Sequence, residues 1–141
     1  MSDFELWTVF VGAAQGAENH IQHFTTLLFG FLVASYLIGA QIDRIMTVII
    51  VSLYSFMALR FAFLFFFSAD DVVALADVLR VRAQDPESGL SWLEIGPVKI
   101  IFNGVFVAML LSFAASLVFL RHVRRNKIGA SHLAPASQSA G

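Results

Sequence analysis

Residues 45–67 read IMTVIIVSLYSFMALRFAFLFFF, and this stretch decides the fold class. Its one charged residue is Arg60, and its other polar groups are hydroxyls. At 1.5 Å per residue, a helix of this length spans about 35 Å, which is enough to cross the hydrocarbon core of a bilayer. The stretch therefore predicts a transmembrane helix.

Two further apolar runs, residues 21–40 and 98–120, lie on either side of it and are also long enough to cross a bilayer. Over the 141 residues, 58 % are hydrophobic and 13 % are charged, whereas soluble domains carry about 25 % charged residues. A soluble core of this size cannot bury so many apolar side chains. We therefore expect an all-α integral membrane protein with three transmembrane helices.

The segments outside these spans predict two more helices. Residues 3–18 are apolar enough to touch lipid but too short for a fourth span, so they either lie at the interface or continue into the first span. Residues 68–83 carry an apolar stripe at helical spacing, and Ser68 with Asp71 resembles a capping box. We therefore expect an N-terminal amphipathic helix and another amphipathic helix within the 68–97 loop.

The composition also excludes several classes of protein. The chain has no cysteine, so it is not a disulfide scaffold, and its net charge of −1 gives no reason to expect a nucleic-acid partner. Residues 1–43 contain no Lys or Arg, so we expect no cleaved secretory signal. We expect one membrane domain over residues 1–127 and a disordered tail over residues 128–141, where small, uncharged residues show no periodicity.

Charged residues are distributed unequally between the two ends of the spans. The link 41–44 and the basic end 121–127 contain a single acidic residue, Asp43, and all other acidic residues lie on the opposite side with Arg80 and Arg82. The positive-inside rule therefore places the N-terminus outside, in the periplasm, and the C-terminus in the cytoplasm of a bacterial inner membrane. The residues that set this orientation and could attract anionic lipid are Arg44, Arg121, Arg124, Arg125 and Lys127.

Small residues recur at four-residue steps along the predicted helices. In lipid, helices associate through close packing, so such steps mark faces where two backbones approach each other. We expect these faces to hold helices together within one chain and between chains. They are Gly12 with Gly16, Gly30 with Ala34, Ser35 with Gly39, and Ala108 with Ser112 and Ser116.

Arg60 is the charge that lies deepest in a predicted span. It precedes Phe67 by seven residues, about 10 Å below the outer boundary, where a charge costs at least about 2.5 kcal/mol. We therefore expect it to face a polar partner. The resulting cluster is either a pocket for an anion, a quinone head or a lipid headgroup, or a hydrogen-bond network that fixes helix register. Its other candidate members are His23, Thr26, Asn103, Glu18 and Glu94.

Glu18, His20 and His23 form a second candidate group, because residues three apart share one side of a helix. Two imidazoles and a carboxylate are ligands suited to zinc or iron, but no HExxH-type motif is present, and interfacial histidines more often have a structural role. We therefore predict no cofactor at this group, and keep quinone, haem or metal as an alternative.

The sequence contains no catalytic constellation: no GxSxG motif, no P-loop, no cysteine nucleophile and no pair of carboxylates deep within the spans. We therefore expect a small, non-enzymatic membrane protein that acts as a homo-oligomer or as a subunit of a larger membrane complex. Two alternatives stay open. One is an oligomeric channel with Arg60 in the path of an anion. The other is a redox accessory subunit that binds quinone, haem or metal near His20, His23 and Arg60.

Overall fold

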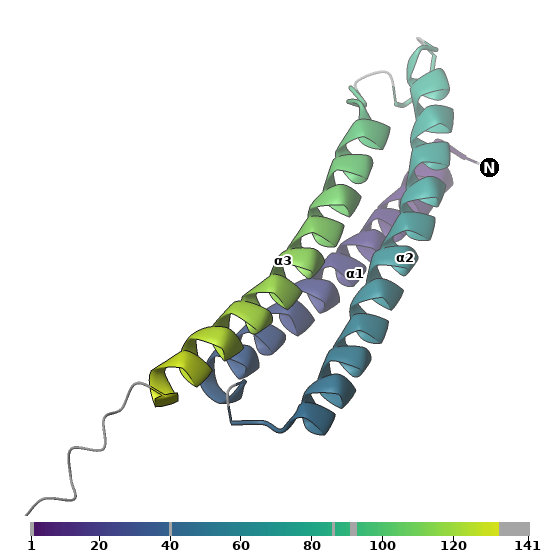
Figure 1. The fold of residues 1–141 in the computed structure, drawn as a ribbon. Helices are drawn as coiled ribbons and strands as arrows, with labels where there is room; N and C mark the ends of the chain where they lie inside the picture. Colours follow the sequence, from purple (N-terminus) through teal and green to yellow (C-terminus); the bar gives the residue numbers. More distant parts are fainter. Residues whose placement is uncertain (1, 40, 86, 91–92, 133–141) are drawn as a thin grey trace, which may run out of the picture.

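Three long helices make up the computed structural model, which describes residues 2–39, 41–85, 87–90 and 93–132, with side chains up to residue 126. The helices are α1 (Asp3–Ile38), α2 (Arg44–Ala83) and α3 (Val98–His132) (Figure 1). α1 and α3 run in one direction and α2 runs in the other. Each helix is long and apolar enough to cross a membrane. The predicted all-α class, with three helices long and apolar enough to cross a membrane, is therefore confirmed.

The described residues contain no separate amphipathic helix: residues 3–18 follow the second predicted alternative and continue into the first span, and the prediction of a separate helix over residues 68–83 is wrong. Residues 3–18 are the first part of α1, and residues 68–83 are the last part of α2, without a break at Ser68. A side-chain cap supplies acceptors to backbone amides that lack helical partners. The Phe-rich run before Ser68 is itself helical, so the amides around Ser68 already have partners in the preceding turn and no cap forms there.

The helix starts that do form use other caps. Ser2 and Glu5 make a capping box at α1: the Ser2 amide donates to Glu5 Oε2 at 2.8 Å, and the Glu5 amide donates to Ser2 Oγ at 3.2 Å. At α2, the Asp43 carboxylate accepts a hydrogen bond of 2.6 Å from the Met46 amide. α3 ends at His132, so it includes residues 128–132 of the expected tail, and residues 133–141 lie outside the description.

α1 and α2 pack against each other where their buried residues follow a seven-residue repeat. On α1, Ala17, Phe24 and Phe31 recur every seven residues. On α2, the buried positions are separated alternately by four and three residues. This spacing is typical of two helices that pack with a left-handed twist. These α2 positions are Ala58, Ala62, Phe65, Ala69, Val72, Ala76 and Leu79.

α2 is too long to lie wholly within a bilayer. Its 40 residues span about 60 Å at 1.5 Å per residue, about twice the thickness of a hydrocarbon core. Its last part, residues 68–83, pairs with residues 3–18 of α1 around a small cluster of Leu6, Leu79 and Leu90. We call these two segments the paired extension.

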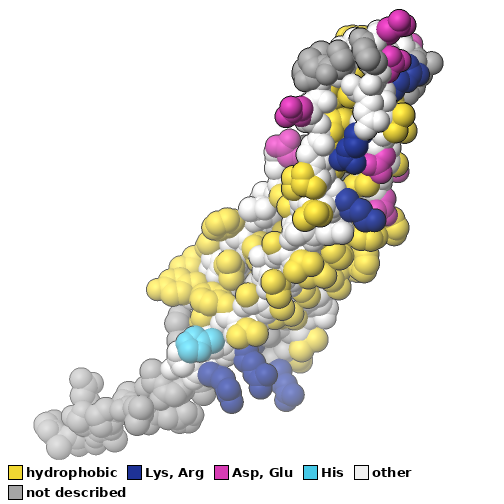
Figure 2. Space-filling view, turned by 90° about the horizontal axis from the view of Figure 1, so that it is seen from above, with side chains coloured by type: hydrophobic (Ala, Val, Ile, Leu, Met, Phe, Trp, Pro, Cys, Tyr) yellow, Lys and Arg dark blue, Asp and Glu magenta, His cyan; other side chains and the backbone are white. Residues whose placement is uncertain are grey.

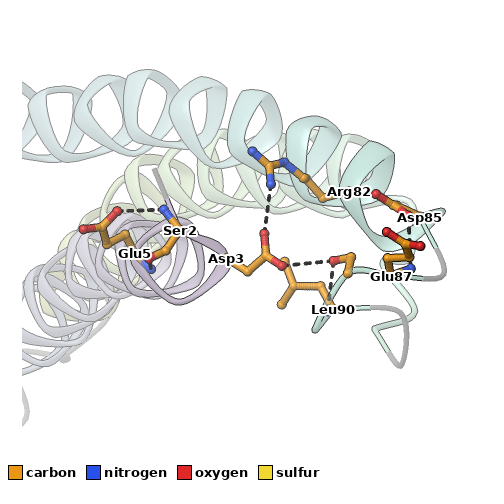
Figure 3. A network of polar contacts seen from close by, with 8 residues as sticks. Ser2, Asp3, Glu5, Arg82, Asp85, Glu87 and Leu90 are labelled. Atoms are coloured by element: carbon orange, nitrogen blue, oxygen red, sulfur yellow. Dashed lines mark hydrogen bonds and ion pairs between the residues drawn. The ribbon is translucent and has the colours of Figure 1, made fainter.

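A polar network closes the far end of the paired extension (Figure 3). Arg82 forms an ion pair with Asp3 at 3.1 Å, and the other oxygen of Asp3 accepts a hydrogen bond of 3.2 Å from Ser88 Oγ. Arg80 donates to the carbonyl oxygens of Ile95 and Gly96 at 3.3 and 3.0 Å. The connection between α2 and α3 is thereby held against both helices of the extension.

Charge divides the molecule into two ends. On the face seen in Figure 2, acidic side chains gather at one end with a few basic ones among them, and a hydrophobic belt separates them from basic side chains at the other end. The acidic end is that of the paired extension, where α1 begins and α2 ends. The basic end is where α2 begins and where Arg121, Arg124 and Arg125 lie on α3.

Candidate functional site

Arg60 does not join the polar cluster that the sequence predicts. It is exposed on α2, on the side opposite the buried positions Ala58 and Ala62. Its neighbours on that face, Phe56 and Phe63, are each more than half exposed. Within the described part of the chain, no hydrogen bond or ion pair joins Arg60 to another residue. The expected polar partner is therefore not supplied by the chain's own described residues.

The polar residues of α1 do come together, but along one helix. Gln22 Nε2 donates to Glu18 Oε1 at 3.4 Å, and Thr26 Oγ1 donates to the Gln22 carbonyl at 2.9 Å. His23 Nδ1 lies 2.6 Å from the Asn19 carbonyl. A carbonyl only accepts, so Nδ1 carries the proton and Nε2 of a neutral ring is left as an acceptor.

The His23 ring also reaches α2. It lies 5.5 Å, between ring centroids, from Phe61. Gln22, His23 and Thr26 line an open groove together with Leu27 and Phe61. Asn103 and Glu94 are exposed and form no described contact with this groove. The groove at Phe61 is thus lined by Gln22, His23 and Thr26 of α1. Arg60, Asn103 and Glu94 do not line it.

The candidate metal ligands do not converge. His20 is half-buried, whereas Glu18 and His23 are exposed, and Nδ1 of His23 is taken by the Asn19 carbonyl. No three His, Cys, Asp or Glu residues in the described ranges are placed to hold a metal ion together.

The outer side of α1 has two different faces. One face carries bulky side chains, among them Phe29 and Tyr36, which are 64 % and 63 % exposed. The other face carries small or polar residues in alternating steps of four and three, and we call it the α1 stripe. Nothing lies within 4 Å of the position that a Cβ would take at its three glycines. The stripe consists of Gly12, Gly16, Asn19, His23, Thr26 and Gly30.

The small residues predicted to pack helices fall into three groups. Ser35, Gly39 and Ser116 are buried between helices, and a Cβ at Gly39 would clash with the Ser35 carbonyl oxygen and lie 3.2 Å from Leu120 Cδ1. Ala34 and Ser112 are half-buried. The remaining positions have little or no cover from the described chain: Gly12, Gly16, Gly30 and Ala108.

A buried polar contact in the middle of the bundle is absent from the sequence-based prediction. Tyr54 Oη and Ser116 Oγ lie 2.8 Å apart and connect α2 to α3, and Ser116 Oγ also donates to the Phe113 carbonyl at 2.6 Å. The Tyr54 ring stacks on Phe31 with centroids 3.8 Å apart. The signal for this contact was a lone tyrosine within one apolar run and one of two serines within another.

Comparisons with protein-family models, with curated proteins and with solved structures found no match for this chain. The candidate site is therefore defined by the chain's own geometry. It is the α1 stripe with the adjoining groove at Phe61.

Proposed function

We propose that the protein is a non-enzymatic integral membrane protein that self-associates through the α1 stripe. The carrying observation is that this side of α1 has uncovered glycines and hydrogen-bonding groups, whereas the other exposed side has bulky apolar groups. Bulky apolar side chains suit lipid, and small residues suit a close helix neighbour. A polar group within lipid is costly unless it finds a partner.

A second copy of the chain fits this stripe. Copies inserted in the same orientation bring the stripe against itself across a two-fold axis, at matching depth. The Asn19 side-chain amide offers N–H donors, and His23 Nε2 offers an acceptor. The stripe therefore supplies both halves of a hydrogen bond between copies, and its glycines allow the two backbones to approach.

The orientation remains part of the proposal. Basic residues gather at the end where α2 begins, which supports placing that end in the cytoplasm and the paired extension outside. The two alternatives, an anion path lined by Arg60 and a redox site near His20 and His23, stay predictions.

Disulfide cross-linking tests the proposed self-association directly, because the chain has no native cysteine. Thr26 lies on the stripe, and its neighbour Thr25 is exposed on a different side of α1. We expect Thr26→Cys to form a covalent dimer in native membranes under mild oxidation, and Thr25→Cys, the matched control, to stay monomeric. Equal cross-linking of the two variants, or none in either, contradicts the proposal.

A further inference from the structure

An apolar cleft opens among the three helices at the basic end. Its walls include Phe31 and Ile38 of α1, Ile50 and Val51 of α2, and Leu120 of α3. In Figure 1, α2 diverges from α1 and α3 toward this end. The cleft is narrow, about 30 Å³, so an apolar chain would lie along its open side and only part of that chain would enter between the helices.

Small residues keep the cleft open. Ala34, Ser35 and Gly39 line it on the α1 side, where larger side chains would fill it. Gly39 is already packed against the Ser35 carbonyl and Leu120. The four-residue step from Ser35 to Gly39, which the sequence suggested as a helix-packing step, therefore also borders an unfilled space.

Arg124 contacts the wall of the cleft, and Arg121 lies three residues before it on α3. Arg124 is half-buried and donates a hydrogen bond to Oγ1 of Thr47, which is itself a wall residue. A guanidinium has five N–H groups, so most of them stay available to a second acceptor. Arg121 follows the wall residue Leu120 directly, is exposed and has no partner in the described part of the chain.

Little negative charge offsets these arginines. Arg44 begins α2 beside the same end and is exposed. Asp43, its neighbour, caps α2 through the Met46 amide and keeps its negative charge, so one carboxylate stands against several arginines. The mouth of the cleft thus combines cationic donors with an apolar interior, which matches a molecule with an anionic head and an apolar tail.

We propose that this cleft binds one anionic phospholipid, with an acyl chain along the apolar walls and its phosphate at Arg124 and Arg121. Arginine forms paired, charge-assisted hydrogen bonds to phosphate, and anionic lipid is drawn to basic segments at the membrane surface. The site differs from general attraction to the basic end because Arg124 is fixed at the cleft by Thr47.

Native mass spectrometry of the purified protein in mild detergent tests this site, with phosphatidylglycerol and phosphatidylcholine of identical acyl chains as probes. We expect one phosphatidylglycerol to bind in preference to phosphatidylcholine. Arg124→Ala should weaken that binding about tenfold. Arg125→Ala removes the same charge from the next, exposed position and should change binding less than about twofold. Equal losses in the two variants would show diffuse charge attraction and overturn the proposal.

Two variants test the acyl part of the site. Ala34→Phe fills the cleft without changing charge and should weaken phosphatidylglycerol binding as much as Arg124→Ala does. Ala115→Phe makes the same change at an exposed position of α3 and should leave binding unchanged. Equal binding of both lipids to the parent protein, or displacement of the lipid by glycerol phosphate at similar concentration, overturns the proposal. If Arg124→Ala fails to fold, Ala34→Phe and Arg124→Lys still test the proposal. Arg124→Lys keeps the charge and should retain the preference for phosphatidylglycerol.

Discussion

The contact between Tyr54 and Ser116 is a buried side-chain hydrogen bond that links α2 to α3. A hydrogen bond between helices in a membrane protein contributes about 0.6 kcal/mol on average, because the groups also find partners in the unfolded state. Tyr54 additionally stacks on Phe31, so its ring joins all three helices at one level. The ring therefore contributes more to stability than its hydroxyl does.

Removing the hydroxyl and removing the ring should have separable effects. We expect Tyr54→Phe to lower the free energy of unfolding by about 0.6 kcal/mol, and Tyr54→Ala to lower it by about 3 kcal/mol because a cavity is left. Reversible unfolding in mixed micelles measures both. In a double-mutant cycle with Ser116→Ala, the two single changes should couple; strict additivity would mean that the hydrogen bond contributes nothing to stability.

Arg60 shows at residue scale what the sequence did not determine. Its depth in the span followed from helix geometry, but its direction depends on which side of α2 faces α1 and α3. The buried positions Ala58, Ala62 and Phe65 set that side, and Arg60 lies opposite to it. His23 and Thr26, by contrast, share one face of α1 through helical spacing alone, and the structure places both in one groove.

Among the helices, the three apolar segments were predictable, and the continuity of the helix across residue 68 was not. Length and apolar composition determine whether a helix can cross a bilayer, and these are local properties. Whether residues 68–83 start a new helix depends on the residues before Ser68 staying helical and on packing against residues 3–18 of α1. The seven-residue repeat of buried positions crosses Ser68 without interruption, and this pattern was the available signal for one continuous helix.

A substitution at a glycine of the α1 stripe tests whether this face of the helix forms the contact between copies. We expect Gly30→Leu to weaken dimerisation at least about tenfold, because a bulky side chain keeps the two backbones apart. The fold of the single chain should persist, since nothing lies within 4 Å of the added Cβ. Gly104→Leu is the matched control, because Gly104 is also exposed and uncovered, but on α3. Energy transfer between labelled copies in vesicles measures dimerisation. An equal loss of dimerisation in both variants would contradict self-association through the α1 stripe.

At the scale of the whole molecule, the unequal charge of the two ends connects the orientation with both proposed sites. If the basic end faces the cytoplasm, the lipid cleft lies in the cytoplasmic leaflet and the paired extension stands outside the membrane. The ion pair between Arg82 and Asp3 is partly exposed, so it contributes at most about 1 kcal/mol. The extension is therefore held mainly by Leu6, Leu79 and the repeat of buried residues below them.

Two glutamines at opposite ends of α2 report this orientation. Gln84 directly follows the last residue of α2, Gln41 lies three residues before its first, and both are exposed. In intact spheroplasts, we expect a membrane-impermeant maleimide to label Gln84→Cys and to label Gln41→Cys only after lysis. The parent chain has no cysteine, so each signal comes from one position. The reverse labelling pattern would mean that the protein has the opposite orientation and that the cleft lies in the outer leaflet. The arginines at the cleft would then face a periplasmic surface, although the positive-inside rule predicts them at a cytoplasmic one.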